Sequence, residues 1–344
     1  MTLSPHPRVL HVDNREAFFD SMDRTYHWKY DVLAAQPGIR CVDVRAEIKK
    51  SEAREFDILM VGIWGLPLEP RYPLKGRLPT AVLGVIPKRC VVLEDMREWT
   101  FDGGIDALCD HINRFYHYVI ATYECEGLER VRRNCPGIRK FFVLPHYINT
   151  QVYRDYGRTK IRDVILFGNT KVCKYPFRNR LKRILLNSNL DVEVVAHPGY
   201  EQFDADKCGE GLAIRINESR LAVATPSMSN YLVSKYYEIS ASRTVVAGTM
   251  PASGESIWGG NYVALRNEMS DREILERLSA ALADPERLRS VADSMYDKIH
   301  RYHSLDAFVP AVNEILREIY ADTSNAAAAT AHPTVSARSH AGDF

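Results

Sequence analysis

Residues 229–248 read S-N-Y-L-V-S-K-Y-Y-E-I-S-A-S-R-T-V-V-A-G and predict a helix followed by a buried strand. The helix is expected to begin at Ser227 or Ser229, because a hydroxyl side chain that follows Pro226 is a typical N-cap. The β-branched residues within Thr244–Ala247 are typical of a buried parallel strand. A helix that begins at the edge of such a sheet predicts an anion-binding site.

Two charged residues of this helix, Lys235 and Glu238, lie three positions apart and therefore share one face. One interpretation places them in the predicted anion site. The alternative is an ion pair on the helix surface, which would stabilise the fold by only about 0.5 kcal/mol.

Short apolar runs alternate with helical patterns along the chain, which is typical of a parallel sheet covered by helices on both faces. The first series of predicted strands is Val9–Val12, Ile39–Val44, Ile58–Ile63, Cys90–Leu93, Tyr118–Ala121 and Phe141–Leu144. The second series is Val164–Phe167, Val192–Ala196, Leu221–Ala224, Val245–Ala247 and Tyr262–Leu265. A break in the pattern near residues 150–162 predicts two doubly wound α/β domains, 1–155 and 156–322.

The C-terminal part of the chain predicts helices and then a tail. Ser270–Tyr320 is rich in helix-forming residues, with Asp284-Pro285 as a stop and restart signal and Pro310 as a kink or a first helical residue. Residues 323–344 contain almost no large apolar side chain, so they are expected to be disordered.

The composition excludes several classes of protein. The 45 Lys and Arg residues are balanced by 44 Asp and Glu, so no general field attracts nucleic acid or an anionic membrane. The seven cysteines show no Cys-x-x-Cys spacing, which favours a reducing, cytoplasmic location over a disulfide framework. The longest apolar stretch, Ile58–Leu68, is too short and too rich in Gly and Pro to span a bilayer. At most peripheral membrane contact is expected.

A loop after the first strand of the second series carries phosphate-binding character. Gly168 allows close approach of a ligand to the backbone, and Lys171, Lys174 and Arg178 supply positive charge to neutralise a pyrophosphate. The alternative is a solvated basic helix that continues through Arg180.

Two further segments offer weaker signals. His197 follows a strand and is a candidate for contact with a nucleobase, although a plain Pro-Gly turn explains the same residues. Asp204-Ala205-Asp206 matches an Asp-x-Asp metal motif but lies in a polar loop instead of at the end of an apolar strand. The chain has neither a Gly-x-Gly-x-x-Gly fingerprint nor a Gly-x-Ser-x-Gly elbow, which disfavours nicotinamide binding and α/β-hydrolase chemistry.

In the first domain, the loops that follow strands are expected to face an acceptor, meaning a substrate whose hydroxyl receives a transferred group. Asp13 and Asp95 are candidates for the base that takes a proton from an acceptor hydroxyl, and His27 is a further candidate. Asn14 and Trp64 are candidates for acceptor contacts, Trp64 through stacking on a sugar ring. Helix capping by the Asp residues and a core position for the Trp are the alternatives.

The segment around Glu238 resembles the GT-B glycosyltransferases, in particular the group 1 and spore-maturation CgeB-like members. In that family the second Glu of a Glu-x7-Glu motif holds the ribose of the donor nucleotide, and Glu238 matches its position. Asn230 replaces the first Glu, and Arg243 stands where a Gly is expected. The resemblance covers residues 140–320 best.

The resemblance implies two Rossmann-like domains that face a central cleft, with the terminal helices crossing back to the first domain. It further implies a glycosyltransferase that moves a sugar from a nucleotide-diphosphate sugar to a hydroxyl of a glycan or glycoconjugate, as in polysaccharide biosynthesis, without a metal or other cofactor. The implied donor-binding residues are Gly168, Asn169, Lys174, Arg178, His197, Ser229, Lys235 and Glu238. The implied catalytic residues are Asp13, Asp95, Arg178 and Lys235. The alternatives are a nucleotide-sugar 2-epimerase of the same fold and a non-catalytic nucleotide-sugar-binding protein.

Overall fold

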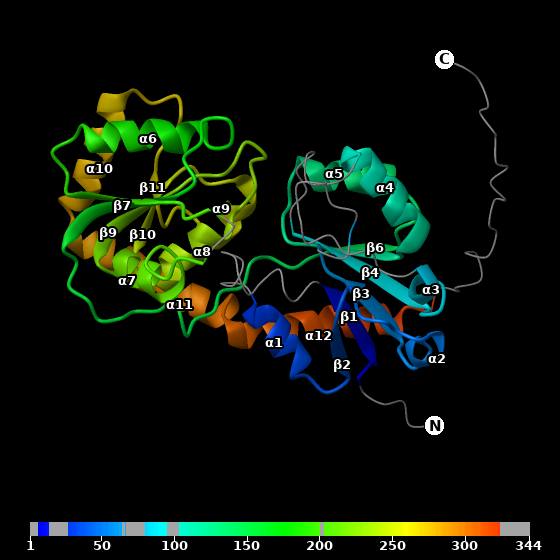
Figure 1. Cartoon of the computed structure of the whole chain (residues 1–344). Helices are drawn as coiled ribbons and strands as arrows, with labels where there is room; N and C mark the ends of the chain where they lie inside the picture. The colour runs from blue at the N-terminus through cyan, green and yellow to red at the C-terminus, as the bar shows by residue number, and fades with distance from the viewer. Residues whose placement is uncertain are drawn as a thin grey trace, which may run out of the picture.

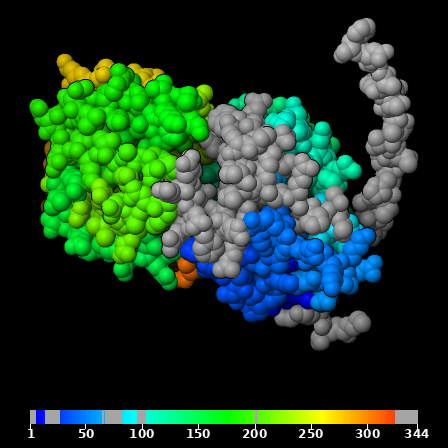
Figure 2. Space-filling view, in the orientation of Figure 1, coloured from blue at the N-terminus to red at the C-terminus, as the bar shows by residue number. Residues whose placement is uncertain are grey.

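The computed structural model describes residues 6–13, 27–63, 66, 80–94, 103–199 and 203–323 of the 344-residue chain. Two parallel β-sheets lie in separate lobes that stand side by side (Figure 1). The space-filling view shows the second lobe in green beside the blue and cyan parts of the first (Figure 2). The predicted tail lies outside the described residues from position 324 onward.

The first lobe contains a six-stranded parallel sheet in the order β2-β1-β3-β4-β5-β6. Its strands are β1 (Val9–Asp13), β2 (Ile39–Asp43), β3 (Ile58–Val61), β4 (Lys88–Leu93), β5 (Tyr118–Ala121) and β6 (Lys140–Val143). Its helices are α1 (Trp28–Ala34), α2 (Lys50–Ala53), α3 (Thr80–Leu83), α4 (Gly104–Phe115) and α5 (Glu126–Asn134). One face packs on α4 and α5, and the opposite face packs on α1.

The second lobe contains a five-stranded parallel sheet in the order β11-β10-β9-β7-β8. Its strands are β7 (Arg162–Gly168), β8 (Val192–Ala196), β9 (Ser219–Ala224), β10 (Val245–Gly248) and β11 (Val263–Ala264). Its helices are α6 (Pro176–Leu186), α7 (Gly209–Asn217), α8 (Ser234–Ala241), α9 (Ala252–Trp258), α10 (Asp271–Leu282) and α11 (Pro285–Tyr302). The core has one layer against α6 and α10 and another against α7, α8 and α11.

The predicted α/β fold class is confirmed, and every predicted strand is present with small differences at its ends. These strands were readable because both faces of a parallel sheet are buried, so each strand is a nearly continuous apolar run. No helix in the described ranges combines the length and the apolar character needed to cross a membrane.

The last helix, α12 (Leu305–Ala321), returns to the first lobe (Figure 1). Its apolar face, including Phe308 and Val312, packs in the same cluster as strand β1 and helix α1. The helix is interrupted between α11 and α12, where Ser304 caps α12 by accepting a hydrogen bond from the N–H of Ala307. The sequence predicted no break there. Pro310 lies inside α12, so its prediction as a first helical residue is wrong.

Candidate functional site

In the second sheet, β8 lies on one side of β7 and β9 lies on the other, so the connections from these strands run in opposite directions. Such a switch point leaves a crevice at the carboxyl ends of the strands. Arg178, from the first turn of α6, lies there and is only 2% exposed. Its guanidinium donates to the carbonyl of Asn169, after β7, and to the carbonyl and hydroxyl oxygens of Thr225, after β9. Arg178 therefore joins the two loops that bound the crevice.

Lys235, in the first turn of α8, points at the same loop. Its Nζ donates to the carbonyl oxygen of Phe167 at 2.6 Å and lies 3.4 Å from the centroid of the Phe167 ring. Gly168 has φ of +87°, and a Cβ added there would lie 2.7 Å from the Lys235 Nζ. The Gly therefore supplies both the left-handed backbone and the space that the ammonium group occupies.

The two charges of α8 do not form a surface ion pair, because Lys235 is 9% exposed and Glu238 is 7% exposed. Burial, assisted by the charge of Arg178, holds the pKa of Lys235 well below its usual range, while the carboxylate of Glu238 opposes this shift. Arg178 and a protonated Lys235 near a helix N-terminus would form a positive site, and a bound anion would favour the charged form of Lys235. The surface alternative for Lys235 and Glu238 is wrong.

His197, after β8, belongs to the same region. Burial is the main cause that lowers the pKa of His197 to about 4, and the charges of Lys235, Arg178, Lys174 and Lys171 contribute to this shift in that order. The ring is therefore neutral at neutral pH. Its Nδ1 accepts a hydrogen bond from the N–H of Gly199 at 3.0 Å, which places the ring proton on Nε2.

Three predicted donor residues occupy the loops around these side chains. Asn169 accepts from the N–H of Lys171 through Oδ1, so it shapes the loop after β7. The carbonyl of Lys174 accepts from the N–H of Met228, which ties that loop to the one after β9. Ser229 lies half-buried in the latter loop.

The predicted start of the helix at Ser227 or Ser229 is wrong. Helix α8 begins at Ser234, with Val233 as its N-cap residue. The hydroxyl of Ser227 instead accepts from the N–H of Ser229 in a local turn, and Asn230 adopts a left-handed φ of 47°. The helix terminus at this crevice is therefore formed by residues 234 and 235, not by Ser229.

Arg243, the second departure from the family pattern, lies away from the carboxyl edge of the sheet. It occupies the turn between the end of α8 and the start of β10, with φ of 55°. Its guanidinium pairs with Asp155 at 2.7 Å and with Asp293 at 2.6 Å. Because parallel strands place their carboxyl ends at the opposite edge, Arg243 does not obstruct the crevice beside Lys235.

The Asp-x-Asp segment has a local role. Asp204 accepts from the Nζ of Lys207 at 2.6 Å and from the N–H of Asp206, and the Lys207 hydrogen bond lowers the pKa of Asp204. Across the described ranges, no three His, Cys, Asp or Glu side chains are grouped so as to hold a metal ion.

The first sheet has its own switch point, between β1 and β3, and Asp13 lies there at the end of β1. The carboxylate of Asp13 packs against Gly62, after β3. A Cβ added at Gly62 would lie 1.9 Å from the Oδ2 of Asp13. Asp13 is 8% exposed and lines a pocket at this edge of the sheet.

Other residues of this pocket escaped the sequence analysis. His11 precedes Asp13 by two positions on β1, so both side chains lie on one face of the sheet. Burial lowers the pKa of His11 to about 4. Lys29 and Glu94 form an ion pair of 3.2 Å between α1 and the end of β4. The two-residue spacing of His11 and Asp13 on a strand could have predicted that both side chains share a face. The pairing of Lys29 with Glu94, 65 residues apart, could not have been predicted from the sequence.

The other first-lobe predictions concern His27, Asn14, Trp64 and Asp95. The ring of His27 pairs with Asp31, one turn along α1, at 3.3 Å. Asn14, Trp64 and Asp95 lie outside the described residues, so their predicted roles stay predictions.

Solved structures with the same fold are glycosyltransferases of low sequence identity. Sucrose-phosphate synthase from Thermosynechococcus elongatus has a TM-score of 0.59 and 12% identity, over 91% of this chain and 99% of that chain. HepE from Anabaena, solved with UDP and glucose, has a TM-score of 0.56 and 11% identity, over 91% of this chain and 100% of that one. A glycosyltransferase from Rickettsia africae has a TM-score of 0.54 and 11% identity, over 92% and 99%.

Searches with the sequence found no matching protein-family model and no matching curated protein. The chain nevertheless shares with these neighbours two parallel sheets with flanking helices over nearly its whole length. Its fold is therefore the GT-B fold of glycosyltransferases.

Proposed function

We propose that this protein is a glycosyltransferase that moves a sugar from a nucleotide-diphosphate sugar to a hydroxyl acceptor. The observation that supports this most strongly is the pair of buried basic side chains, Arg178 and Lys235, at the switch point of the second sheet. Buried positive charge at a strand-end crevice suits the diphosphate of a donor. This crevice lies in the second lobe, which is the lobe that the family resemblance assigns to the donor.

On the donor side, each residue has a distinct role in the proposal. Arg178 and Lys235 meet the negative charge that grows on the departing diphosphate, assisted by the N–H groups at the start of α8. Glu238 accepts hydrogen bonds from the ribose hydroxyls. Gly168 keeps the loop backbone close, and His197 presents a neutral ring, with its proton on Nε2, toward the sugar or the base.

On the acceptor side, Asp13 serves as the base. The acceptor oxygen forms a bond to the anomeric carbon while its proton passes to the Asp13 carboxylate. The bond from the anomeric carbon to the diphosphate oxygen breaks, and its electron pair leaves with the diphosphate. A single displacement of this kind inverts the anomeric centre.

We propose that the reaction needs no metal ion, because two fixed cations already face the diphosphate and Asp204 is engaged by Lys207. We further place the protein in the CgeB-like branch, in a domain arrangement of 1–155 and 156–322 and in the cytoplasm. Free thiols at all seven cysteine positions fit a reducing compartment. A glycan or glycoconjugate is the proposed acceptor class, as in polysaccharide biosynthesis, although one fold neighbour was solved with DNA.

The test is a screen of UDP-, GDP-, TDP- and CDP-sugars for binding, by thermal shift, and for release of nucleoside diphosphate with and without acceptor. At least one donor should bind and be consumed faster when an acceptor is added. Binding without any turnover would indicate a binding protein. Inversion at the sugar C2 without an acceptor would indicate an epimerase instead.

The same assay tests the metal requirement. Activity should survive EDTA and should be unchanged in Asp204→Ala. Loss of activity with EDTA that Mn²⁺ restores, together with an inactive Asp204→Ala protein, would contradict the metal-free mechanism.

A further inference from the structure

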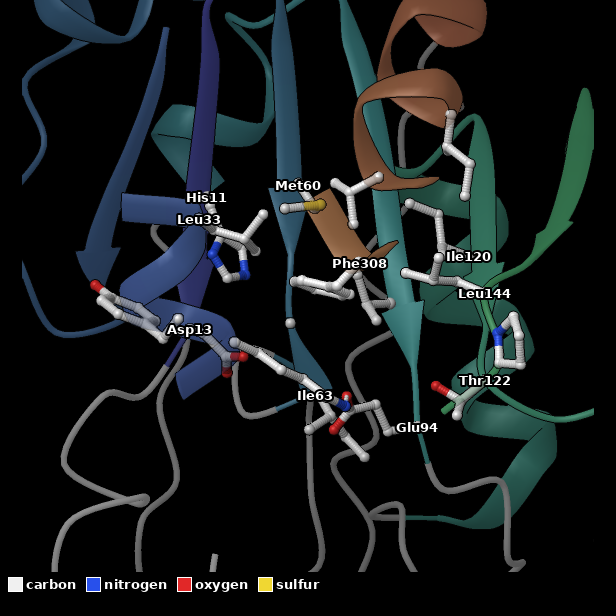
Figure 3. A pocket seen from close by; sticks show the side chains of 17 residues that line it. His11, Asp13, Leu33, Met60, Ile63, Glu94, Ile120, Thr122, Leu144 and Phe308 are labelled. Atoms are coloured by element: carbon white, nitrogen blue, oxygen red, sulfur yellow. Dashed lines mark hydrogen bonds and ion pairs between the residues drawn. The ribbon is translucent and has the colours of Figure 1, made fainter. Parts of the chain in front are cut away.

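A pocket lies beside Asp13 in the first lobe (Figure 3). It lies under the carboxyl edge of the sheet, between the ends of β1, β3, β4 and β5 and the helices α1 and α12. Its volume is about 70 Å³. Helix α12 contributes Phe308, Val312 and Ile315, so the pocket is complete only when the end of the chain has crossed back to the first lobe.

The two ends of the pocket differ in chemistry. Figure 3 shows Asp13, Glu94 and Thr122 at the mouth, where the strands end. Lys29 joins them through its ion pair with Glu94. The deeper part lies beneath the strands and is formed mainly by apolar side chains, with the ring of His11 beside them (Figure 3). The apolar ones are Leu33, Met60, Val92, Ile120, Leu144 and Phe308.

The deep end offers a polar guest few hydrogen-bond partners, because apart from the residues at the mouth only His11 and Tyr30 among the lining residues have polar side chains. A buried hydroxyl without a hydrogen-bond partner costs about 1–3 kcal/mol, and hydrocarbon and thioether side chains offer essentially none. Since a cavity holds one water in roughly 10–15 Å³, the observed volume suits an apolar group of several heavy atoms. A phenyl ring or a short alkyl chain has this size. A sugar ring with its hydroxyl groups does not match the lining.

We infer that the acceptor is an alcohol with an apolar group, which inserts an aryl or short alkyl part beneath the sheet and leaves its hydroxyl at Asp13. This inference rests on the proposed transfer to a hydroxyl, but it replaces the glycan by an alcohol whose apolar part enters the pocket. The ion pair of Lys29 and Glu94 at the mouth fits the polar part of such a molecule. Helix α12 thereby becomes part of acceptor specificity, although it follows the donor lobe in the chain.

The test compares 2-phenylethanol and 1-butanol with glycerol and ethylene glycol. Binding is measured first, by ligand-observed NMR on the full chain without donor, and transfer is measured second. The apolar alcohols should bind, and their kcat/KM should exceed that of the diols by about tenfold or more, because burial of a phenyl-sized group is favourable.

Leu144→Phe fills the pocket from its lining and should abolish both the binding of 2-phenylethanol and its advantage in transfer. Val143→Phe is the matched control, because Val143 is the adjacent residue on β6 and is 38% exposed. Donor binding and melting temperature should be unchanged in both variants.

Three outcomes are informative. No binding of the apolar alcohols, or equal transfer to all four alcohols, would overturn the inference. So would retained binding and retained preference in Leu144→Phe. If 2-phenylethanol binds in a Leu144-dependent way but no nucleotide sugar is bound or consumed, then the glycosyltransferase proposal fails while the ligand class of the pocket stands.

Discussion

The two sheets share a topological feature, a switch point, but they place opposite charges there. The second sheet has Arg178 and Lys235, which are fixed by hydrogen bonds to backbone carbonyls of their own lobe. The first sheet has Asp13, packed against Gly62 above an apolar pocket. In the proposed reaction, the second lobe holds the diphosphate, the part that all donors share, with fixed basic side chains. The other is built to place one carboxylate beside a shaped, largely apolar space.

The largest effect is expected at the first switch point. Asp13→Asn keeps the shape of the side chain but removes the base, so kcat for transfer should fall by about 10²–10⁴-fold. Donor affinity should stay unchanged, since the proposed donor site lies in the other lobe. Steady-state kinetics combined with donor titration measures both quantities, and an active Asp13→Asn protein would remove Asp13 from catalysis.

Gly62→Ala displaces the same carboxylate without changing Asp13 itself, because the added Cβ would lie 1.9 Å from the Oδ2 of Asp13. It should lower kcat in the same direction as Asp13→Asn. Gly84→Ala is the matched control, since a Cβ at Gly84 meets no atom within 4 Å. Equal kinetics for the two Ala variants would show that the position of the carboxylate does not matter.

The next effect is expected at the second switch point. Arg178→Ala should lower kcat/KM by about 10²–10³-fold, and Arg178→Lys should lower it less, because Lys keeps the charge but loses the forked geometry. Arg178 also bridges two loops, so the melting temperature is measured for each variant. Arg180→Ala is the control, because Arg180 instead pairs with Asp271 of α10. A wild-type kcat/KM in Arg178→Ala would contradict the donor assignment.

Glu238→Gln should raise the donor KM by about tenfold, because an amide accepts weaker hydrogen bonds from ribose hydroxyls than a carboxylate does. The carboxylate of Glu238 also raises the pKa of Lys235, so its removal should lower that pKa further. Donor binding in this variant should therefore weaken at lower pH than in the wild type. Glu276→Gln, on the exposed face of α10, should change neither property.

The smallest effect is expected at Arg243, outside both switch points. Arg243→Gly relieves a left-handed φ of 55° but loses partly exposed ion pairs with Asp155 and Asp293. In Arg243→Gly, the relief of backbone strain and the loss of the ion pairs nearly cancel in the free energy of unfolding. Arg243→Ala keeps the backbone strain and also loses the ion pairs. The Ala variant should be less stable than the Gly variant by about 1 kcal/mol in denaturant unfolding. A change in donor affinity in either variant would contradict the placement of Arg243 away from the site.

Much of the fold could be predicted from the sequence, because buried parallel strands are continuous apolar runs and the break near residue 150 separates two series of them. The start of α8 could not. Ser227 resembles a helix cap, but its hydroxyl accepts from Ser229 within a tight turn, and the helix begins five residues after Ser229, at Ser234. Local hydrogen bonding of Ser competes with capping, so the two readings look alike in sequence.

The candidate site was predicted where the charged residue follows a strand, as for Asp13, or lies on a face shared with another charge, as for Lys235. Contacts between distant segments could not be predicted. The hydrogen bonds from Arg178 to Thr225 span 47 residues, and the wall that α12 adds to the pocket comes from the far end of the chain. Such contacts follow from the strand order, which no local pattern specifies.

We propose that the second switch point is a diphosphate site built around a buried Lys235. In the free protein the lowered pKa of Lys235 means that the folded state binds fewer protons than the unfolded state, so this residue makes stability rise as pH rises through that pKa. A bound diphosphate favours the charged ammonium and reverses this dependence. The stabilisation that a nucleoside diphosphate gives should therefore shrink as pH rises.

The direct measurement is the melting temperature with UDP, GDP, TDP or CDP, compared with the matching nucleosides, between about pH 7.5 and 9.5, above the phosphate ionisation near about pH 6. We predict that at least one diphosphate stabilises the wild type and that its effect shrinks with pH. Lys235→Met and Gly168→Ala should lose the effect, whereas Gly157→Ala, with a similar backbone strain but no contact at its Cβ, should keep it. Equal shifts for diphosphates and nucleosides, or a wild-type response in Lys235→Met, would contradict the account.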